Sequence, residues 1–353
     1  MKILFCFTLN KSFLANFFLE MAEKLVFEGF EVNVLSLKKN DLEINIKGIH
    51  YIQKQKGGYF NNYRTIYRVI KKIKPDILIS NFSYVNPALL CGSILSVKSN
   101  IAWLHTLTTQ NDSSNKSIFI KRMFLKLADK IIVNSPYLHN ELIQLFKIND
   151  KRIHPLPFWT TIESYTSKPL VLSENNHFKI GCPGRFIPSK NQMLIIEAMK
   201  LLDTEVLKHT KLYLAGDGPE KLSLEKYINE KCLKENVIFL GLLSAEEMKY
   251  FYEEMDVIVL PSSHEAFGLV FLEALSVAKN TLVSQNFGAL SFIDKNYPNL
   301  NKIVFDPNTS VELSEKLNCI IKGDILPSEY FYNLYTHNFD KERIIQKFKD
   351  III

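Results

Sequence analysis

Short apolar runs alternate with stretches of helical periodicity along the whole chain, and this alternation is the feature that most restricts the fold. Near the amino terminus, Leu14, Phe17, Phe18, Met21 and Leu25 recur at the spacing of one helix face. Strand-length runs that are each followed by a helix favour a parallel sheet with helices on both faces. The pattern therefore predicts an α/β protein.

The alternation forms two series, separated by a polar connector at residues 159–177 that has no clear periodicity. In the first series we expect strands at residues 3–7, 31–36, 77–81, 101–104 and 130–134. In the second series we expect strands at residues 179–183, 211–215, 237–241, 257–261, 281–284 and 302–305, with helices at 192–202, 220–232, 245–254, 269–277 and 311–321. A chain of 353 residues also exceeds the size at which one hydrophobic core usually stops growing. We therefore predict two Rossmann-like doubly wound domains facing a cleft, at residues 1–165 and 166–339, with ligand at the carboxyl ends of the strands.

Positive charge is concentrated in the first of these domains. Up to residue 165 there are 22 Lys and Arg against 12 Asp and Glu, a balance of +10, whereas the remainder has 21 against 25, a balance of −4. A basic half suits anionic lipid, an anionic acceptor or nucleic acid, and a solvated basic face without a partner is an equal alternative. Nucleic acid is disfavoured, because the chain has no recognised nucleic-acid module and no basic stripe rich in aromatic residues.

Cysteine usage and hydropathy bear on the cellular location. The five cysteines are scattered and form no C-x-x-C pair, which favours reduced, mostly buried thiols in a cytoplasmic protein. The apolar run after Lys2 is too short for a signal peptide and is better explained as a strand. Residues 77–97 lack charge, but polar residues and a proline interrupt them, so we expect no membrane span. Peripheral association with the inner membrane surface is possible through a basic amphipathic helix at residues 118–127.

Two cations follow the first strand of the second series, in the sequence GRFIPSKN. Arg185 comes directly after the strand, and Lys190 stands at the entrance to the next helix. Arginine offers a planar fork for two phosphate oxygens and lysine a mobile point charge, so the pair can hold a leaving diphosphate. Taken alone, an exposed pair of cations without a partner is an equally good explanation.

Two carboxylates stand eight residues apart in EAFGLVFLE, after the apolar strand at residues 257–261. Glu265 falls in a loop and Glu273 about two helical turns further on, so the two are expected to face roughly the same side. Glu273 can accept the hydroxyls of a ribose, and Glu265 those of a transferred sugar. Apolar neighbours surround Glu273 in the sequence, and a ligand or a cation is therefore expected as its partner. Phe267, Gly268 and Leu269 open the helix between them, where free amide groups attract phosphate oxygens.

The order GRFIPSKN, LYLAGDGPE, VIFLGLLS and DVIVLPSSHEAFGLVFLEAL resembles the second domain of the family-4 retaining glycosyltransferases of the GT-B fold, over about residues 178–322. No single motif carries this resemblance, but the combination is specific. It implies transfer of a sugar from a UDP- or GDP-linked donor to a glycan or lipid-linked acceptor held by the first domain, with retained anomeric configuration. It also implies no metal and no cofactor besides the donor, and it places the terminal helix, residues 340–353, on the first domain.

The resemblance assigns roles by position. Arg185 and Lys190 match a diphosphate clamp, Glu265 the residue that contacts the donor sugar, and Glu273 the ribose ligand. Two further matches are Gly216 with Asp217, as a turn beside the nucleotide, and His105, as a histidine near the sugar. A tight turn before a helix explains Gly216 and Asp217 equally well, and a histidine at a strand end is often structural.

Several segments depart from the family pattern, and two of them bear on the function. The first loop reads Thr8-Leu9-Asn10-Lys11-Ser12 where a glycine pair is common, and Ser291 stands where a glutamate is typical. These departures leave open a nucleotide-sugar-binding protein without transfer activity. A nucleotide-sugar epimerase within a similar two-domain frame also remains open, and it would need acid and base residues that the sequence does not single out. Assembly of a bacterial surface polysaccharide or lipopolysaccharide is the setting that the resemblance favours.

Overall fold

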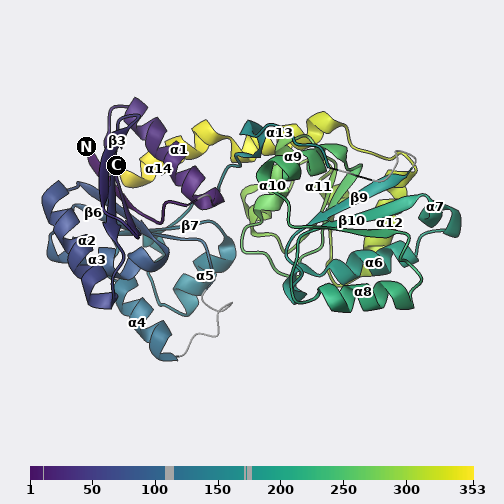
Figure 1. Ribbon diagram of the computed structural model, residues 1–353, viewed down its shortest axis with the longest axis horizontal. Coiled ribbons are helices and arrows are strands. Elements are labelled where there is room, and N and C mark those ends of the chain that lie inside the picture. The colour runs from purple at the N-terminus through teal and green to yellow at the C-terminus, as the bar shows by residue number, and fades with distance from the viewer. Residues whose placement is uncertain (11, 108–114, 171, 173–176) are drawn as a thin grey trace. The chain divides into compact units, whose positions relative to one another are not determined.

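The computed structural model describes residues 1–10, 12–107, 115–170, 172 and 177–353. The chain divides into two compact units, one formed by Met1–Phe158 with Lys341–Ile353 and the other by Trp159–Asp340 (Figure 1). Each unit is a mostly parallel sheet covered by helices, which confirms the predicted fold class. Lys11 in the first loop and residues 171 and 173–176 in the connector lie outside the described part of the chain.

The boundary between the units falls at Phe158, seven residues before the expected position at residue 165. The segment after it contains a short 3-10 helix, Ile162–Ser164, and is bound to the second unit. Among its contacts there is Lys249, whose ammonium group donates hydrogen bonds to the carbonyl oxygens of Glu163 (3.1 Å) and Tyr165 (2.9 Å). Hydrogen bonds between residues so far apart in the sequence leave no periodic pattern, so the sequence pattern did not locate the boundary correctly.

The first unit contains an eight-stranded sheet in the order β3-β4-β2-β1-β5-β6-β7-β8. All neighbouring strands are parallel except β3 and β4, which are antiparallel. The strands are β1 (Lys2–Cys6), β2 (Glu31–Lys38), β3 (Leu42–Ile46), β4 (Ile49–Gln55), β5 (Ile77–Asn81), β6 (Ser99–Leu104), β7 (Lys130–Val133) and β8 (Ile153–Pro155). The helices are α1 (Phe13–Phe27), α2 (Tyr59–Ile73), α3 (Val85–Ile94), α4 (Asn115–Leu125), α5 (Pro136–Gln144) and α14 (Lys341–Ile352).

Helices cover both faces of this sheet, because successive residues of each strand point to opposite sides. The ring of Phe5 in β1 contacts Phe18 of α1 and Phe348 of α14. Its neighbour Leu4 belongs instead to a buried cluster that includes Ile66 of α2. The strands are thus buried on both faces, which is why they read as continuous apolar runs in the sequence.

The terminal helix α14 belongs to the first unit although it follows the second unit in the sequence. Three ion pairs join α1 and its end to α14: Lys341 with Glu20 (2.6 Å), Lys24 with Glu342 (2.6 Å) and Lys349 with Glu28 (2.8 Å). Exposed ion pairs contribute little individually, so the buried ring of Phe348 against Trp103 is the stronger link.

The second unit contains a six-stranded parallel sheet in the order β11-β10-β9-β12-β13-β14. The strands are β9 (Phe178–Pro183), β10 (Thr210–Ala215), β11 (Val237–Gly241), β12 (Val257–Leu260), β13 (Thr281–Ser284) and β14 (Val304–Phe305). The helices are α6 (Gln192–Lys200), α7 (Thr204–Lys208), α8 (Lys221–Glu230), α9 (Ala245–Glu254), α10 (Leu269–Ser276), α11 (Leu300–Ile303), α12 (Ser310–Ile321) and α13 (Ser328–Phe339). One continuous buried cluster joins this sheet to α6, α8 and α12.

Every predicted strand is present, most of them within two residues of the expected bounds, but β8 was not predicted and two further regions differ. The β3–β4 hairpin was not predicted, although Lys47 and Gly48 at its turn both have the positive φ angles (53° and 78°) of a two-residue hairpin turn. The strand expected at residues 302–305 is shorter, because α11 occupies its first half and only Val304 and Phe305 pair with β13.

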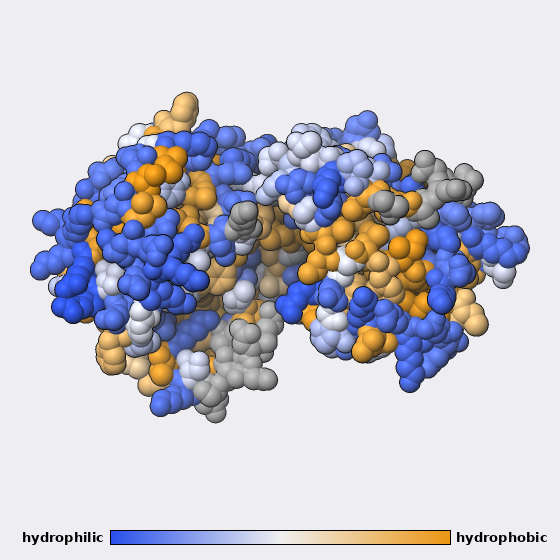
Figure 2. Space-filling view, in the orientation of Figure 1, coloured by the Kyte–Doolittle hydropathy of each residue, from blue (hydrophilic) through white to orange (hydrophobic). Residues whose placement is uncertain are grey.

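On the face shown in Figure 2, hydrophilic side chains dominate, and hydrophobic ones gather in patches between them. Three of the five cysteines, Cys6, Cys91 and Cys182, are buried, and the other two are exposed. Among the described helices, none has both the length and the apolar composition that a bilayer crossing requires.

Candidate functional site

The second sheet reverses its strand order between β9 and β12. From β9 the chain proceeds through β10 to β11 on one side, and β12, β13 and β14 follow on the other side. In open parallel sheets, ligands bind beyond the carboxyl ends of the two strands at such a reversal. The loops that follow β9 and β12 carry Arg185, Lys190 and Glu265, so the predicted residues lie at this position.

The loop after β10 lies directly on the loop after β9. The amide of Phe186 donates to the carbonyl oxygen of Asp217 (3.0 Å), and the amide of Gly184 to that of Ala215 (2.9 Å). Gly216 has a φ of 152°, and a Cβ atom at this residue would lie 2.0 Å from the carbonyl oxygen of Gly184. Only glycine therefore permits this approach. The motif AGDGPE positions the loop that carries Arg185.

The two exposed charges of these loops differ in their contacts. The Arg185 side chain is exposed and makes no hydrogen bond or ion pair with any other described residue. Asp217 is also exposed, and its carboxylate accepts a hydrogen bond from the amide of Gly218 (2.8 Å). The guanidinium group is thus available to an external anion at the carboxyl edge of the sheet.

Lys190 and Glu265 meet across the strand reversal. The ammonium group of Lys190 donates to a carboxylate oxygen of Glu265, and the two side chains are 21 % and 20 % exposed. The backbone supports this contact, because the amide of Ser263 donates to the carbonyl oxygen of Ser189 (2.9 Å). A partly buried pair is desolvated on one side and accessible on the other, so a ligand can reach both charges.

The segment around Glu265 is fixed by the loop after β13. Its amide donates to the carbonyl oxygen of Asn286 (3.2 Å), and its own carbonyl oxygen accepts from the amide of Gly288 (3.0 Å). Gly268 has a φ of 96°, and a Cβ atom there would lie 2.2 Å from the ring of Phe287. The backbone of Glu265 is therefore fixed on both sides, which positions the side chain that meets Lys190.

The start of α10 offers amide donors. Gly268 is the N-cap residue, and no side chain of the described residues makes a capping hydrogen bond there. The ring of Phe267 is buried, 3 % exposed, and packs edge-on against Phe292 and Phe339. Phe267 can therefore contribute only its backbone to a ligand, and Leu269 begins the helix whose N-terminal dipole favours an anion.

Glu273, one turn into α10, has a neutral partner. The hydroxyl of Tyr252 in α9 donates to its carboxylate (2.7 Å). Burial raises the pKa of Glu273, and the Tyr252 hydrogen bond opposes that rise. Burial and the Glu273 charge together raise the pKa of Tyr252. A cation was one of the two partners expected from the sequence, and the partner that the structure provides is a phenol.

Cys182, near the end of β9, connects the two pairs. Burial raises the pKa of its thiol to about 12, and the charge of Lys190 opposes this. The same thiol also raises the pKa of Tyr252, so it lies within electrostatic range of both residues. Lys190 and Tyr252 thus both act electrostatically on Cys182 or are acted on by it.

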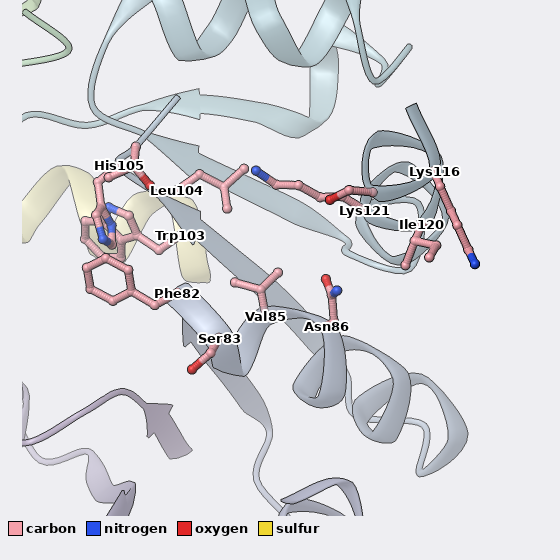
Figure 3. Close-up of a pocket in the computed structure, with 12 residues that line it drawn as sticks. Phe82, Ser83, Val85, Asn86, Trp103, Leu104, His105, Lys116, Ile120 and Lys121 are labelled. Carbon is pink, nitrogen blue, oxygen red and sulfur yellow. The ribbon is translucent and has the colours of Figure 1, made fainter. Parts of the chain in front are cut away.

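His105 belongs to the first unit, directly after β6. Its side chain is 8 % exposed, and neither ring nitrogen has a hydrogen-bond partner among the described residues. Burial lowers the pKa of this histidine to about 4, so the ring is neutral at pH 7. The ring also helps to line a cavity of about 500 Å³, with residues from η1 (Phe82–Tyr84), α3 and α4 (Figure 3).

Comparison with known proteins assigns the family. The model of glycosyl transferases group 1 matches residues 167–336, and that of Glycosyltransferase Family 4 matches residues 14–158. The chain belongs to the family-4 glycosyltransferases. Its fold is GT-B, and the protein is an enzyme of the transferase class.

Individual relatives of this glycosyltransferase are distant. An uncharacterized glycosyltransferase of Methanocaldococcus jannaschii is 25 % identical over 83 % of this chain and 75 % of its own length. The O-antigen biosynthesis glycosyltransferase WclY of Escherichia coli is 24 % identical over 97 % of this chain and 90 % of its own. Among solved structures, HepE of Anabaena in complex with UDP has a TM-score of 0.75 at 18 % identity and covers 99 % of each chain.

Two features of the structure have no signal in the sequence. Tyr252 lies at no motif position, and no sequence signal marks its contact with Glu273. Phe82 follows an apolar strand and carries no sequence signal for its positive φ angle.

Proposed function

We propose that this glycosyltransferase moves a sugar from a UDP- or GDP-linked donor to a glycan or lipid-linked acceptor, with retention of the anomeric configuration. The observation that carries the proposal is the meeting of Lys190 and Glu265 at the strand reversal, beside the exposed guanidinium group of Arg185. Two cations and a helix N-terminus at one sheet edge suit a diphosphate.

In the proposed reaction, the diphosphate binds Arg185 and displaces Glu265 from Lys190. The released carboxylate of Glu265 then accepts hydroxyls of the donor sugar, while Glu273 accepts those of the ribose. Gly216 and Asp217 lie beside the nucleotide, and the amides of residues 267–269 contact phosphate oxygens. His105, which is neutral, accepts or donates one hydrogen bond near the sugar.

Bond breaking separates the anomeric carbon from the phosphate oxygen, and the electron pair stays on the diphosphate. The acceptor oxygen attacks from the face that the diphosphate leaves, and the acceptor proton passes to the departing phosphate oxygen. Arg185 and Lys190 stabilise the charge that accumulates on the leaving group, a contribution of about 3 kcal/mol for a single well-placed group. No metal ion or other cofactor is required by this scheme.

A surface polysaccharide or lipopolysaccharide is the product class we propose, because WclY, which matches nearly the full length, is named for O-antigen biosynthesis. Peripheral membrane association is supported by α4, where Phe119 is 61 % and Met123 56 % exposed between the exposed cations Lys116 and Lys126. Sedimentation with vesicles of phosphatidylglycerol should retain the wild type and lose a Phe119→Ser, Met123→Ser variant. Equal binding of the two would contradict the role of α4.

The test of the function is turnover of a mixed panel of UDP- and GDP-sugars by the purified protein. Arg185→Ala and Glu265→Ala should each lower turnover by about a hundredfold or more. The matched controls are Lys208→Ala and Glu205→Ala, since these residues form an exposed ion pair in the same unit (2.7 Å) and directly precede β10, at the edge of the sheet opposite the carboxyl ends of the strands. Equal turnover in all five proteins would remove the assignment.

A further inference from the structure

Phe82 adopts a backbone conformation that its side chain disfavours. It follows β5 directly and has a φ of 48°, in the left-handed region that bulky residues rarely enter. Half of its side-chain surface is exposed (50 %), so burial of the ring in the core does not compensate for the strained backbone. Retained strain of this kind is concentrated at functional sites.

The strained backbone places the aromatic ring against His105. The two ring centroids are 4.0 Å apart and the planes cross at 80°, an edge-to-face contact. Figure 3 shows both rings at one end of the cavity, with Val85 and Asn86 projecting from α3 and Lys121 from the opposite side. Phe82 therefore presents an aromatic surface beside the one histidine that the family resemblance singles out.

The cavity has the size and polarity of a small-ligand site. Its volume of about 500 Å³ lies within the usual range for such sites. Ser83 and Asn86 contribute polar groups, Val85 and Phe82 apolar ones. Beside it, the nitrogens of His105 have no hydrogen-bond partner among the described residues. A buried polar group in that state is unfavourable, and a ligand hydroxyl would satisfy it.

We infer that Phe82 is the platform on which a pyranose ring of the acceptor stacks, with His105 as the hydrogen-bond partner of one of its hydroxyls. This inference rests on the proposed function and narrows its acceptor to a chain that ends in a sugar residue. The C–H face of a pyranose carries partial positive charge and packs on the negative face of an aromatic ring, while its hydroxyls project sideways to polar groups. A lipid alcohol or a lipid phosphate has no such ring.

The experiment is saturation-transfer NMR with methyl glucopyranoside, methyl galactopyranoside and methyl mannopyranoside, each as α and β anomers, in the presence of UDP or GDP. Irradiation of the protein should transfer saturation to the ring C–H protons of at least one of these glycosides. Phe82→Ala should lower that transfer by about tenfold, the equivalent of about 1.4 kcal/mol, and Phe82→Trp should retain it. The control is Phe60→Ala, which removes an aromatic ring that is 87 % exposed on α2 of the same unit.

Phe82→Gly separates binding from folding. Glycine accepts a φ of 48° without strain, so the thermal midpoint of this variant should equal or exceed that of the wild type while the glycoside signal is lost. A signal that survives in Phe82→Ala and Phe82→Gly, or no signal from any glycoside with the wild type, would overturn the inference. Calorimetry with UDP and GDP on the same samples tests the proposed function separately. If the nucleotide binds and no glycoside gives a signal, the role of Phe82 is refuted and the proposed function is not.

Discussion

The ammonium group of Lys190 is bonded to the carboxylate of Glu265 across the strand reversal of the second sheet, although 75 residues separate them in the sequence. While this pair is formed, Glu265 blocks the ammonium group that a diphosphate would bind, and Lys190 blocks the carboxylate that sugar hydroxyls would bind. Ligand binding and the resting ion pair are alternatives, and this competition can be measured.

Glu265→Gln should strengthen nucleotide binding and weaken turnover at once. Removal of the carboxylate charge frees Lys190 for the diphosphate, so the affinity for UDP or GDP should rise by about threefold to tenfold. Turnover of the sugar donor should fall by about a hundredfold, because the amide no longer accepts sugar hydroxyls as strongly. Calorimetry and a turnover assay measure the two effects, and a fall in both would show that Glu265 supports the diphosphate site instead of competing for it.

Tyr252→Phe should lower the free energy of unfolding, because Tyr252 donates a hydrogen bond to the carboxylate of Glu273. The variant removes the hydrogen bond of 2.7 Å and leaves a buried carboxylate without it, which costs about 1–3 kcal/mol. Because the pKa of Glu273 rises further, the loss of stability should be smallest near pH 4.5 and grow as the pH increases. Urea unfolding at about pH 5 and pH 8 measures this, with Tyr250→Phe on the same helix as control. Equal losses at both pH values would contradict the assignment of the hydrogen bond to the ionised carboxylate.

Gly216→Ala should destabilise the protein by more than strain alone. A methyl group there meets the carbonyl oxygen of Gly184 at 2.0 Å, in addition to the unfavourable φ of 152°. Gly323 also has a positive φ (96°), but no described atom lies within 4 Å of the position that a methyl group would take, so Gly323→Ala reports strain by itself. We expect the free energy of unfolding, measured with urea, to fall by about 1 kcal/mol in Gly323→Ala and by at least about 3 kcal/mol in Gly216→Ala. Similar losses would mean that the two loops do not pack as described.

His105 should make the first unit sensitive to acid. Its pKa is depressed to about 4 in the folded protein, so between pH 6.5 and pH 4 the unfolded chain binds a proton that the folded chain does not. Stability is therefore lost as the pH falls through this window, by about 3 kcal/mol for the full shift. His105→Phe should reduce that loss, whereas His209→Gln, at an exposed site, should not. Identical pH profiles of unfolding for wild type and His105→Phe would refute the buried neutral imidazole.

The sequence was most informative where local pattern and fold agree. Strands β9, β12 and β13 are apolar runs buried on both faces, and their bounds follow from the sequence to within a residue or two. The residues at the strand reversal could be predicted as well, because loops at the carboxyl ends of parallel strands converge. The strand bounds and the convergence of these loops thus predicted that Lys190 and Glu265 lie near the same edge of the sheet.

The remaining features depend on contacts between distant segments. The segment after Phe158 is bound to the second unit by residues far along the chain, such as Lys249 and Tyr335, and no periodicity reports such bonds. The hydroxyl of Tyr252 in α9 reaches Glu273 in α10 although 21 residues separate them in the sequence, and sequence spacing does not encode such a contact. The positive φ of Phe82 occurs without glycine or asparagine, the residues by which such a conformation is usually recognised.

The most direct test of the account is a crystal structure of the protein with bound UDP or GDP. It should show the diphosphate within hydrogen-bonding distance of Arg185 and Lys190, with the Lys190–Glu265 contact broken and the ribose hydroxyls on Glu273. A diphosphate bound elsewhere, or one bound while Lys190 remains paired with Glu265, would contradict the account.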